Sequence, residues 1–244
     1  MRRIITTLAF ALLFSTGFSQ SSPLPKIVEG TVQYKELSQP VYQLVLPNQE
    51  SLEKKWSKHL KDKFGEKLSE TKGGVLVTDE FEIPYSTHKG TIRSWVEYNG
   101  DSAILKSNMS LGENIFSNRN GFEREDSLFL AAIDQFNYNY RVEYYQDKIK
   151  GLKRKRKDLE KSIKAIENTI KSNDKVIKES QQQAKSDDVP NKNELLGRVK
   201  DLDKQNQKLE EERSAKKAEA IVLDKEIKYY GKLLKELIDF KKNN

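Results

Sequence analysis

Residues 142–177 read VEYYQDKIKGLKRKRKDLEKSIKAIENTIKSNDKVI, and apolar side chains recur along them in alternating steps of three and four. The positions of this seam are Val142, Tyr145, Ile149, Leu152, Arg156, Leu159, Ile163, Ile166, Ile170, Asn173 and Ile177. Such a repeat places one narrow apolar stripe along a helix, which is the heptad pattern of a coiled coil. The stretch therefore predicts a long helix that needs a partner helix.

A second seam follows Pro190 and supplies that partner. Its positions are Leu195, Val199, Leu202, Asn206, Leu209, Arg213, Lys216, Ala220, Leu223, Ile227, Tyr230, Leu234 and Leu237. Because proline cannot continue a helix, we predict an antiparallel coiled-coil hairpin over residues 141–244, with a loop near residues 183–190. One continuous helix is the alternative, but it would leave both seams exposed.

The register of the hairpin can also be predicted. In an antiparallel coiled coil, the residue numbers of two facing seam positions have a constant sum, and an a position of the heptad on one arm faces a d position on the other. A sum of 372 meets this condition, centres the turn on Ser186 and places Arg156 opposite Lys216. The next heptad-compatible value, 379, squeezes the turn onto Val189-Pro190. We therefore expect the register of 372.

A dense run of cations lies on the first arm. The candidate anion-binding or partner-binding residues are Lys153, Arg154, Lys155, Arg156 and Lys157, together with Lys216 of the second arm. Five consecutive residues cover every side of a helix, so the run is not one solvated face. A solubilising collar is the alternative. No aromatic residues are interleaved with the run, which argues against nucleic acid as its partner.

Residues 20–140 have the pattern of a small α+β head domain. Alternating residues predict strands over 27–34, 41–46, 75–83, 91–98 and 103–110, with a tight turn at Asn99-Gly100. Asn48 is expected to cap a helix that ends near Phe64 and carries Leu52, Trp56 and Leu60 on one side. Another helix begins near Glu123. The expected fold class is α+β: a small, mostly antiparallel sheet with a packed helix, followed by the coiled-coil hairpin.

The N-terminus has the three parts of an export signal. Met1-Arg2-Arg3 is basic, residues 4–14 are apolar, and small residues precede Gln20. This order predicts a signal peptide over residues 1–19 and an exported protein, periplasmic or extracellular. No later stretch is apolar enough to span a bilayer, so the mature chain is expected to have no transmembrane segment.

Composition narrows the chemistry. The 244 residues are 33% charged and 36% hydrophobic, with no cysteine and two histidines, so thiolate metal sites and cysteine nucleophiles are excluded. Residues 20–140 carry a net charge of −3 and residues 141–244 a net charge of +8. The basic character thus belongs to the hairpin. We predict no catalytic residues, cofactor or metal ion.

Three short motifs carry chemically active side chains. Ser86 and His88 would need an oriented carboxylate to act as nucleophile and base, which residues so close in a turn rarely find. Asp79, Glu80 and Glu82 could serve a carboxylate-based hydrolase, although paired carboxylates are common on exposed strands. Asp101-Ser102-Ala103 resembles a short bacterial O-glycosylation signal, which makes Ser102 a candidate glycosylation site.

A small head with the segment from Leu52 through Trp56 to Leu60, followed by two long seams, resembles uncharacterised exported bacterial envelope proteins. This resemblance is architectural and implies no activity. The leading hypothesis is a noncatalytic envelope protein whose stalk spaces or presents the head to an envelope protein or an anionic envelope polymer. A second copy of the chain is a further candidate partner. The alternatives are a glycan or small-ligand binding module in the head and, third, the hydrolase.

Overall fold

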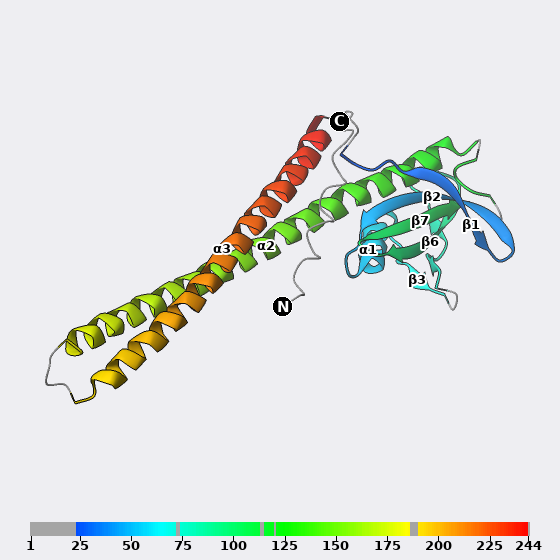
Figure 1. Ribbon diagram of the computed structural model, residues 1–244. Coiled ribbons are helices and arrows are strands. Elements are labelled where there is room, and N and C mark those ends of the chain that lie inside the picture. The colour runs from blue at the N-terminus through cyan, green and yellow to red at the C-terminus, as the bar shows by residue number, and fades with distance from the viewer. Residues whose placement is uncertain (1–22, 72–73, 113–114, 120, 186–189, 244) are drawn as a thin grey trace.

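The computed structural model describes residues 23–71, 74–112, 115–119, 121–185 and 190–243. It confirms the predicted fold class, an α+β head from which a helical hairpin projects (Figure 1). The elements are β1 (Val28–Tyr34), β2 (Leu37–Pro47), α1 (Leu52–Phe64), β3 (Ser69–Glu70), β4 (Leu76–Val77), β5 (Phe81–Glu82), β6 (Lys89–Asn99), β7 (Ser102–Ser110), α2 (Glu123–Gln183) and α3 (Lys192–Asn243). The predicted export signal, residues 1–19, lies outside the described residues.

The sheet is antiparallel at every described pairing. Its strand order is β1-β2-β7-β6-β4-β3, and β5 pairs with β6. The predicted turn at Asn99-Gly100 joins β6 to β7, with Asn99 opposite Ser102 and Gly100 at φ +56°. A position with positive φ favours glycine, because glycine has no Cβ to clash with the backbone.

The predicted strand over residues 75–83 was wrong. The expected strand over 75–83 is interrupted and becomes β4 and β5, because Val75, Thr78 and Phe81 are all buried. A spacing of three cannot keep side chains on one face of a pleated strand. Thr78 instead exchanges hydrogen bonds with Ile92 on β6. The short strand β3 was not foreseen.

Asn48 does not cap α1. The helix begins at Leu52, after Ser51 in a left-handed conformation. The Asn48 side chain donates to the carbonyl of Gly100 at 2.7 Å, and its backbone N–H donates to that of Asp101 at 2.9 Å. Asn48 therefore ties the end of β2 to the β6–β7 turn.

One face of the sheet buries α1 and the first part of α2. Trp56 is fully buried among residues of both helices and the sheet, as its place in the apolar stripe predicted. Its indole N–H donates to the hydroxyl of Ser94 at 2.8 Å, so the ring brings no unpaired donor into the core. His59 stacks on Trp56, and its Nε2 lies 2.8 Å from the carbonyl of Ala132. Burial lowers the pKa of His59.

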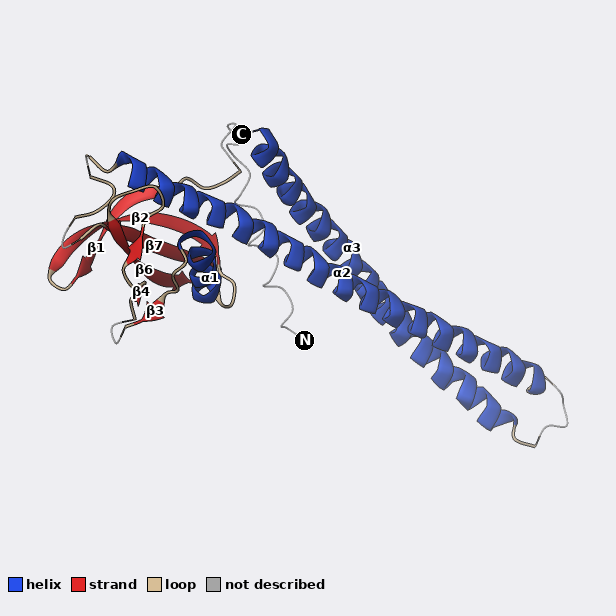
Figure 2. Ribbon diagram, turned by 180° about the vertical axis from the view of Figure 1, so that it is seen from behind, coloured by secondary structure: helices blue, strands red, loops and turns tan. Residues whose placement is uncertain are grey.

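The helix α2 belongs to both parts of the molecule. It has 61 residues, and it runs without interruption from the head into the stalk (Figure 2). The helix α3 returns antiparallel to it over 52 residues. The predicted division at residues 140/141 thus falls inside one helix. The predicted loop includes residues 186–189, outside the described residues.

The predicted register of 372 was wrong by one heptad. The amide of Asn173 donates to the amide oxygen of Asn206 at 2.8 Å, and these two residue numbers add up to 379. Arg156 Nε lies 3.2 Å from Asp224 Oδ1, a pair whose numbers add up to 380. In the expected register Asn173 would have faced the apolar Val199. The amide of Asn206 in turn donates to Asp174 Oδ1 at 2.8 Å, so both seam amides donate to an acceptor on the other arm, which favours the observed register.

The end of α3 lies against α2 near the head. Leu237 is almost fully buried, and Lys241 Nζ lies 5.9 Å from the centre of the Tyr138 ring. Ile221 and Val222 lie off the seam, and both are more than half exposed. Within the described residues, no helix is long and apolar enough to cross a membrane.

Candidate functional site

The structure divides the predicted basic residues between different sides of the stalk. Lys153, Arg154 and Lys157 line one hollow on α2, near the head. Lys150, which was not predicted, joins them. Residues 150, 153, 154 and 157 share a helix face because steps of three and four nearly complete whole turns. This spacing is present in the sequence, but it is easy to miss because Lys155 and Arg156 fall between these residues and make the run of cations continuous.

We call this feature the stalk hollow. It has a volume of about 470 Å3, and it is lined by Gln146, Ile149, Lys150, Lys153, Arg154, Lys157 and Leu234. Ile149 of α2 and Leu234 of α3 are half-buried seam residues and form its apolar floor. Of the described residues, no carboxylate lines the hollow. Its rim therefore carries four positive charges around an apolar surface.

These four cations have no carboxylate partner among the residues that the structure describes. All four side chains are exposed, and none takes part in an ion pair with any residue in the described ranges. Elsewhere on the stalk, pairs such as Lys161 with Asp158 and Lys217 with Glu167 are common. Like charges close together repel, and an anionic ligand would relieve that repulsion.

The other predicted residues lie apart from the hollow. Arg156 is held in the seam, with Nη1 2.7 Å from Glu160 Oε1 in addition to its contact with Asp224. Lys216 Nζ lies 3.5 Å from Glu212 Oε1. The expected convergence of Arg156 and Lys216 on one band is therefore wrong, because it depended on the register of 372. Lys155 is exposed and does not line the hollow.

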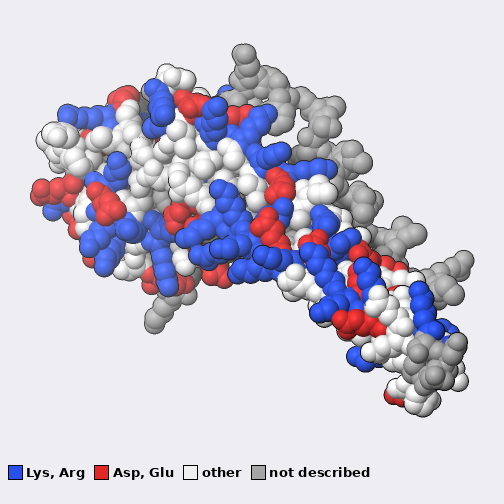
Figure 3. Space-filling view, turned by 90° about the vertical axis from the view of Figure 1, so that its left-hand side faces the viewer, with Lys and Arg blue, Asp and Glu red and all other residues white. Residues whose placement is uncertain are grey.

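The surface reflects this uneven distribution of charge. Figure 3 shows Lys and Arg side chains gathered where the stalk meets the head, whereas farther along the stalk they alternate with Asp and Glu. A positive surface of this kind attracts anions over about one Debye length, roughly 8 Å at physiological salt.

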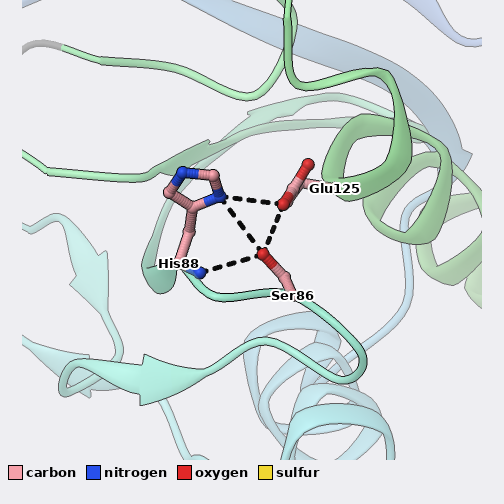
Figure 4. Close-up of polar contacts among 3 residues, drawn as sticks. All are labelled: Ser86, His88 and Glu125. Atoms are coloured by element: carbon pink, nitrogen blue, oxygen red, sulfur yellow. Dashed lines mark hydrogen bonds and ion pairs between the residues drawn. The ribbon is translucent and has the colours of Figure 1, made fainter.

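The structure also brings Ser86 and His88 to a carboxylate, that of Glu125 in the first turn of α2. His88 Nδ1 lies 3.0 Å from Glu125 Oε1, and the hydroxyl of Ser86 donates to the same oxygen (Figure 4). The backbone N–H of His88 donates to Ser86 Oγ at 3.0 Å. Sequence reasoning missed Glu125, which lies 37 residues from His88 in the chain.

This cluster has the wrong geometry for a catalytic triad. In a triad the base faces the nucleophile with one ring nitrogen and the acid with the other. Here the single atom His88 Nδ1 approaches both Ser86 and Glu125, and the serine proton goes directly to the carboxylate. The hydrogen bonds from Ser86 and His88 hold the pKa of Glu125 below its usual value. The cluster fastens the 83–89 loop to the start of α2.

The head has a groove between α1 and the edge of the sheet. This head groove has a volume of about 860 Å3, and its lining includes Lys54, Lys58, Lys61, Lys67, Glu53, Asp62, Glu70, Leu68 and Leu76. The hydroxyl of Tyr98 donates to Glu53 at 2.6 Å. Mixed charges over a partly apolar floor suit a polar ligand of either sign, so the lining selects no single chemistry.

The remaining candidates lie elsewhere on the head. Asp79, Glu80 and Glu82 are exposed, and Glu80 lies 3.4 Å from Lys89 Nζ. Ser102 donates to the carbonyl of Asn99 at 3.1 Å beside the β6–β7 turn. Over the described ranges, no group of three or more histidine and carboxylate side chains is placed to hold a metal ion.

Comparison with known proteins adds no assignment. No protein-family model matches the chain, and the search of curated proteins finds no match. The site must therefore be interpreted from its geometry alone.

Proposed function

We propose that the protein is a noncatalytic, exported envelope protein whose helical stalk spaces the head and holds an anionic envelope component near the head. The observation that carries the proposal is the stalk hollow, where four cations without described carboxylate partners surround an apolar floor. The long stalk supports the spacer role, since residues 142–183 of α2 extend about 60 Å at roughly 1.5 Å per residue.

A soluble polyanion tests the binding role. Dextran sulfate binding is measured across a salt titration for the full chain and for the triple variant Lys153→Gln, Arg154→Gln and Lys157→Gln. We expect the variant to bind on the order of tenfold more weakly at low salt and to depend less on salt, because three charges of the rim are lost.

A matched variant controls for net charge. Lys171, Lys200 and Lys204 are exposed distal residues that form no ion pair within the described residues, and changing all three to Gln removes the same charge. This control is expected to bind nearly as the parent does. Equal losses in both triple variants would show that only overall charge matters, and the proposed site would be withdrawn.

Export has its own test. The intact mass of the protein recovered from its native envelope should show the loss of residues 1–19. Protein that keeps Met1-Arg2-Arg3 would contradict the export proposal without affecting the binding measurement.

A second candidate function is ligand binding in the head groove, which the notable volume of about 860 Å3 favours. A glycan or small charged ligand would lie between α1 and the edge strands. Lys61→Glu inverts one charge of the lining, and glycan-array binding by the parent that this variant loses would support the groove as a site. Unchanged binding would exclude it.

A further inference from the structure

The floor of the stalk hollow limits what its ligand can be. The apolar side chains Ile149 and Leu234 lie between the cations, and both are only partly covered by protein. A fully hydrated polyanion would satisfy the rim but leave this floor in contact with water. A ligand with an apolar chain beside its negative charge would cover the floor as well.

We propose that the stalk hollow binds an anionic membrane lipid, with one acyl chain over Ile149 and Leu234 and its head group among Lys150, Lys153, Arg154 and Lys157. This inference rests on the proposed function and names the ligand class at the same site. The envelope component held near the head is then a lipid surface.

The arrangement of charges supports a lipid. Clusters of at least four Lys and Arg beside an apolar helix face are typical of segments that bind anionic lipids. Long basic side chains can lie along an apolar surface while their charged ends reach the head groups. The hollow is open along the side of the stalk, so a stalk lying in the bilayer interface would present the floor to the acyl chains and the rim to the head groups.

Competing ligands fit less well. An acidic polymer offers no group for the floor. An acidic protein segment could supply both charge and apolar side chains, yet within the described part of the chain the floor consists of Ile149 and Leu234, which lie on helices that offer no strand edge to pair with. A single acyl chain needs no such edge.

The test compares vesicles with soluble anions, using the full chain. Flotation is measured with vesicles of phosphatidylcholine and phosphatidylglycerol in a three-to-one ratio, and with phosphatidylcholine alone. Dextran sulfate, polyglutamate and glycerol phosphate are the soluble probes. We expect flotation with the anionic vesicles only, with no displacement by glycerol phosphate.

Two variants separate the floor from the rim. Leu234→Gln removes apolar surface without changing charge, and we expect it to bind anionic vesicles about tenfold more weakly while binding dextran sulfate as the parent does. Gln146→Glu places a carboxylate at the rim and leaves the floor intact. It is expected to weaken both kinds of binding, which provides a second measurement should Leu234→Gln loosen the hairpin.

The outcomes are distinguishable. Anionic vesicle binding unchanged in Leu234→Gln, with helicity retained, would overturn the lipid proposal, as would parent binding to phosphatidylcholine alone. Polyglutamate binding that equals vesicle binding and is lost in Leu234→Gln would assign the hollow to an acidic protein segment instead. The proposed function fails separately, when the rim triple variant binds dextran sulfate as tightly as the parent.

Discussion

The head and the stalk share the helix α2 but are stabilised in different ways. In the head, α2 contributes Phe129, Ile133 and Phe136 to a wide core that also contains α1 and the sheet. In the stalk the same helix has only a narrow seam, interrupted by Arg156 and Asn173. Burial of apolar side chains in a close-packed core therefore stabilises the head. In the stalk, the pairing of polar residues across the seam fixes the register of the two helices.

The largest effect should come from the head core. Trp56→Ala removes a fully buried ring and is expected to cost about 3–5 kcal/mol of unfolding free energy. Trp95, which is half-buried, remains as the fluorescence probe. Its unfolding transition should shift to lower denaturant, while the helical signal of the stalk is retained. The control Trp95→Ala should cost on the order of 1 kcal/mol. Coincident loss of the stalk would show that the two parts do not differ as described.

The next effect concerns the fastening of α2 to the head. Glu125→Gln weakens the hydrogen bonds from Ser86 and His88 and is expected to cost about 1–3 kcal/mol near neutral pH. Because the pKa of Glu125 is lower in the folded protein, its contribution is complete above the unfolded value of about 4.3 and is lost as pH falls through the folded value.

Denaturant titrations at several pH values test this dependence. The difference between the parent and Glu125→Gln should shrink below the ordinary carboxyl pKa, whereas the exposed Glu226→Gln should show little difference at any pH. A constant difference across the range would mean that the charge of Glu125 has no part in it.

A smaller effect is expected in the stalk seam. Asn206→Leu leaves the amide of Asn173 without its acceptor, and Asn173→Leu leaves Asn206 bonded only to Asp174, so each single change should cost about 1–2 kcal/mol. The double variant should recover most of this loss, since a Leu–Leu layer is apolar on both sides. Thermal melting followed by circular dichroism measures the cycle. Additive losses in the double variant would contradict the pairing of the two asparagines.

The smallest effect belongs to the rim of the stalk hollow. Lys153, Arg154 and Lys157 are exposed and lack ion-pair partners among the described residues, so changing all three to Gln should alter stability by no more than about 0.5 kcal/mol. Thermal melting checks this value. A large destabilisation would mean that these cations serve the hairpin itself rather than a ligand.

The fold was largely predictable because its signals are local and periodic. Only a helix satisfies the spacing of the two seams and of the stripe through Trp56. Only a tight turn suits Asn99-Gly100 between two alternating segments. The interrupted strand at Thr78 was not predictable, since its hydrogen bonds to Ile92 come from a distant strand.

The candidate site was only partly predictable. The cations of α2 were visible in the sequence, but which of them share a hollow depends on the neighbouring arm. The register was predicted from the length of the turn, although the two seam asparagines were the better guide, because a buried amide without a hydrogen-bond partner costs free energy. Leu234 could not be placed beside Ile149 until the register was known. Glu125 reaches His88 only through the tertiary fold.

The register of the stalk determines which residues form the hollow, since it places Leu234 there and separates Arg156 from Lys216. The chain has no cysteine, so introduced pairs can be oxidised without interference. The structure predicts that Asn173→Cys with Asn206→Cys forms a disulfide within one chain, while Asn173→Cys with Val199→Cys does not. Rapid oxidation of the second pair and none of the first, or links only between chains, would contradict the hairpin as described.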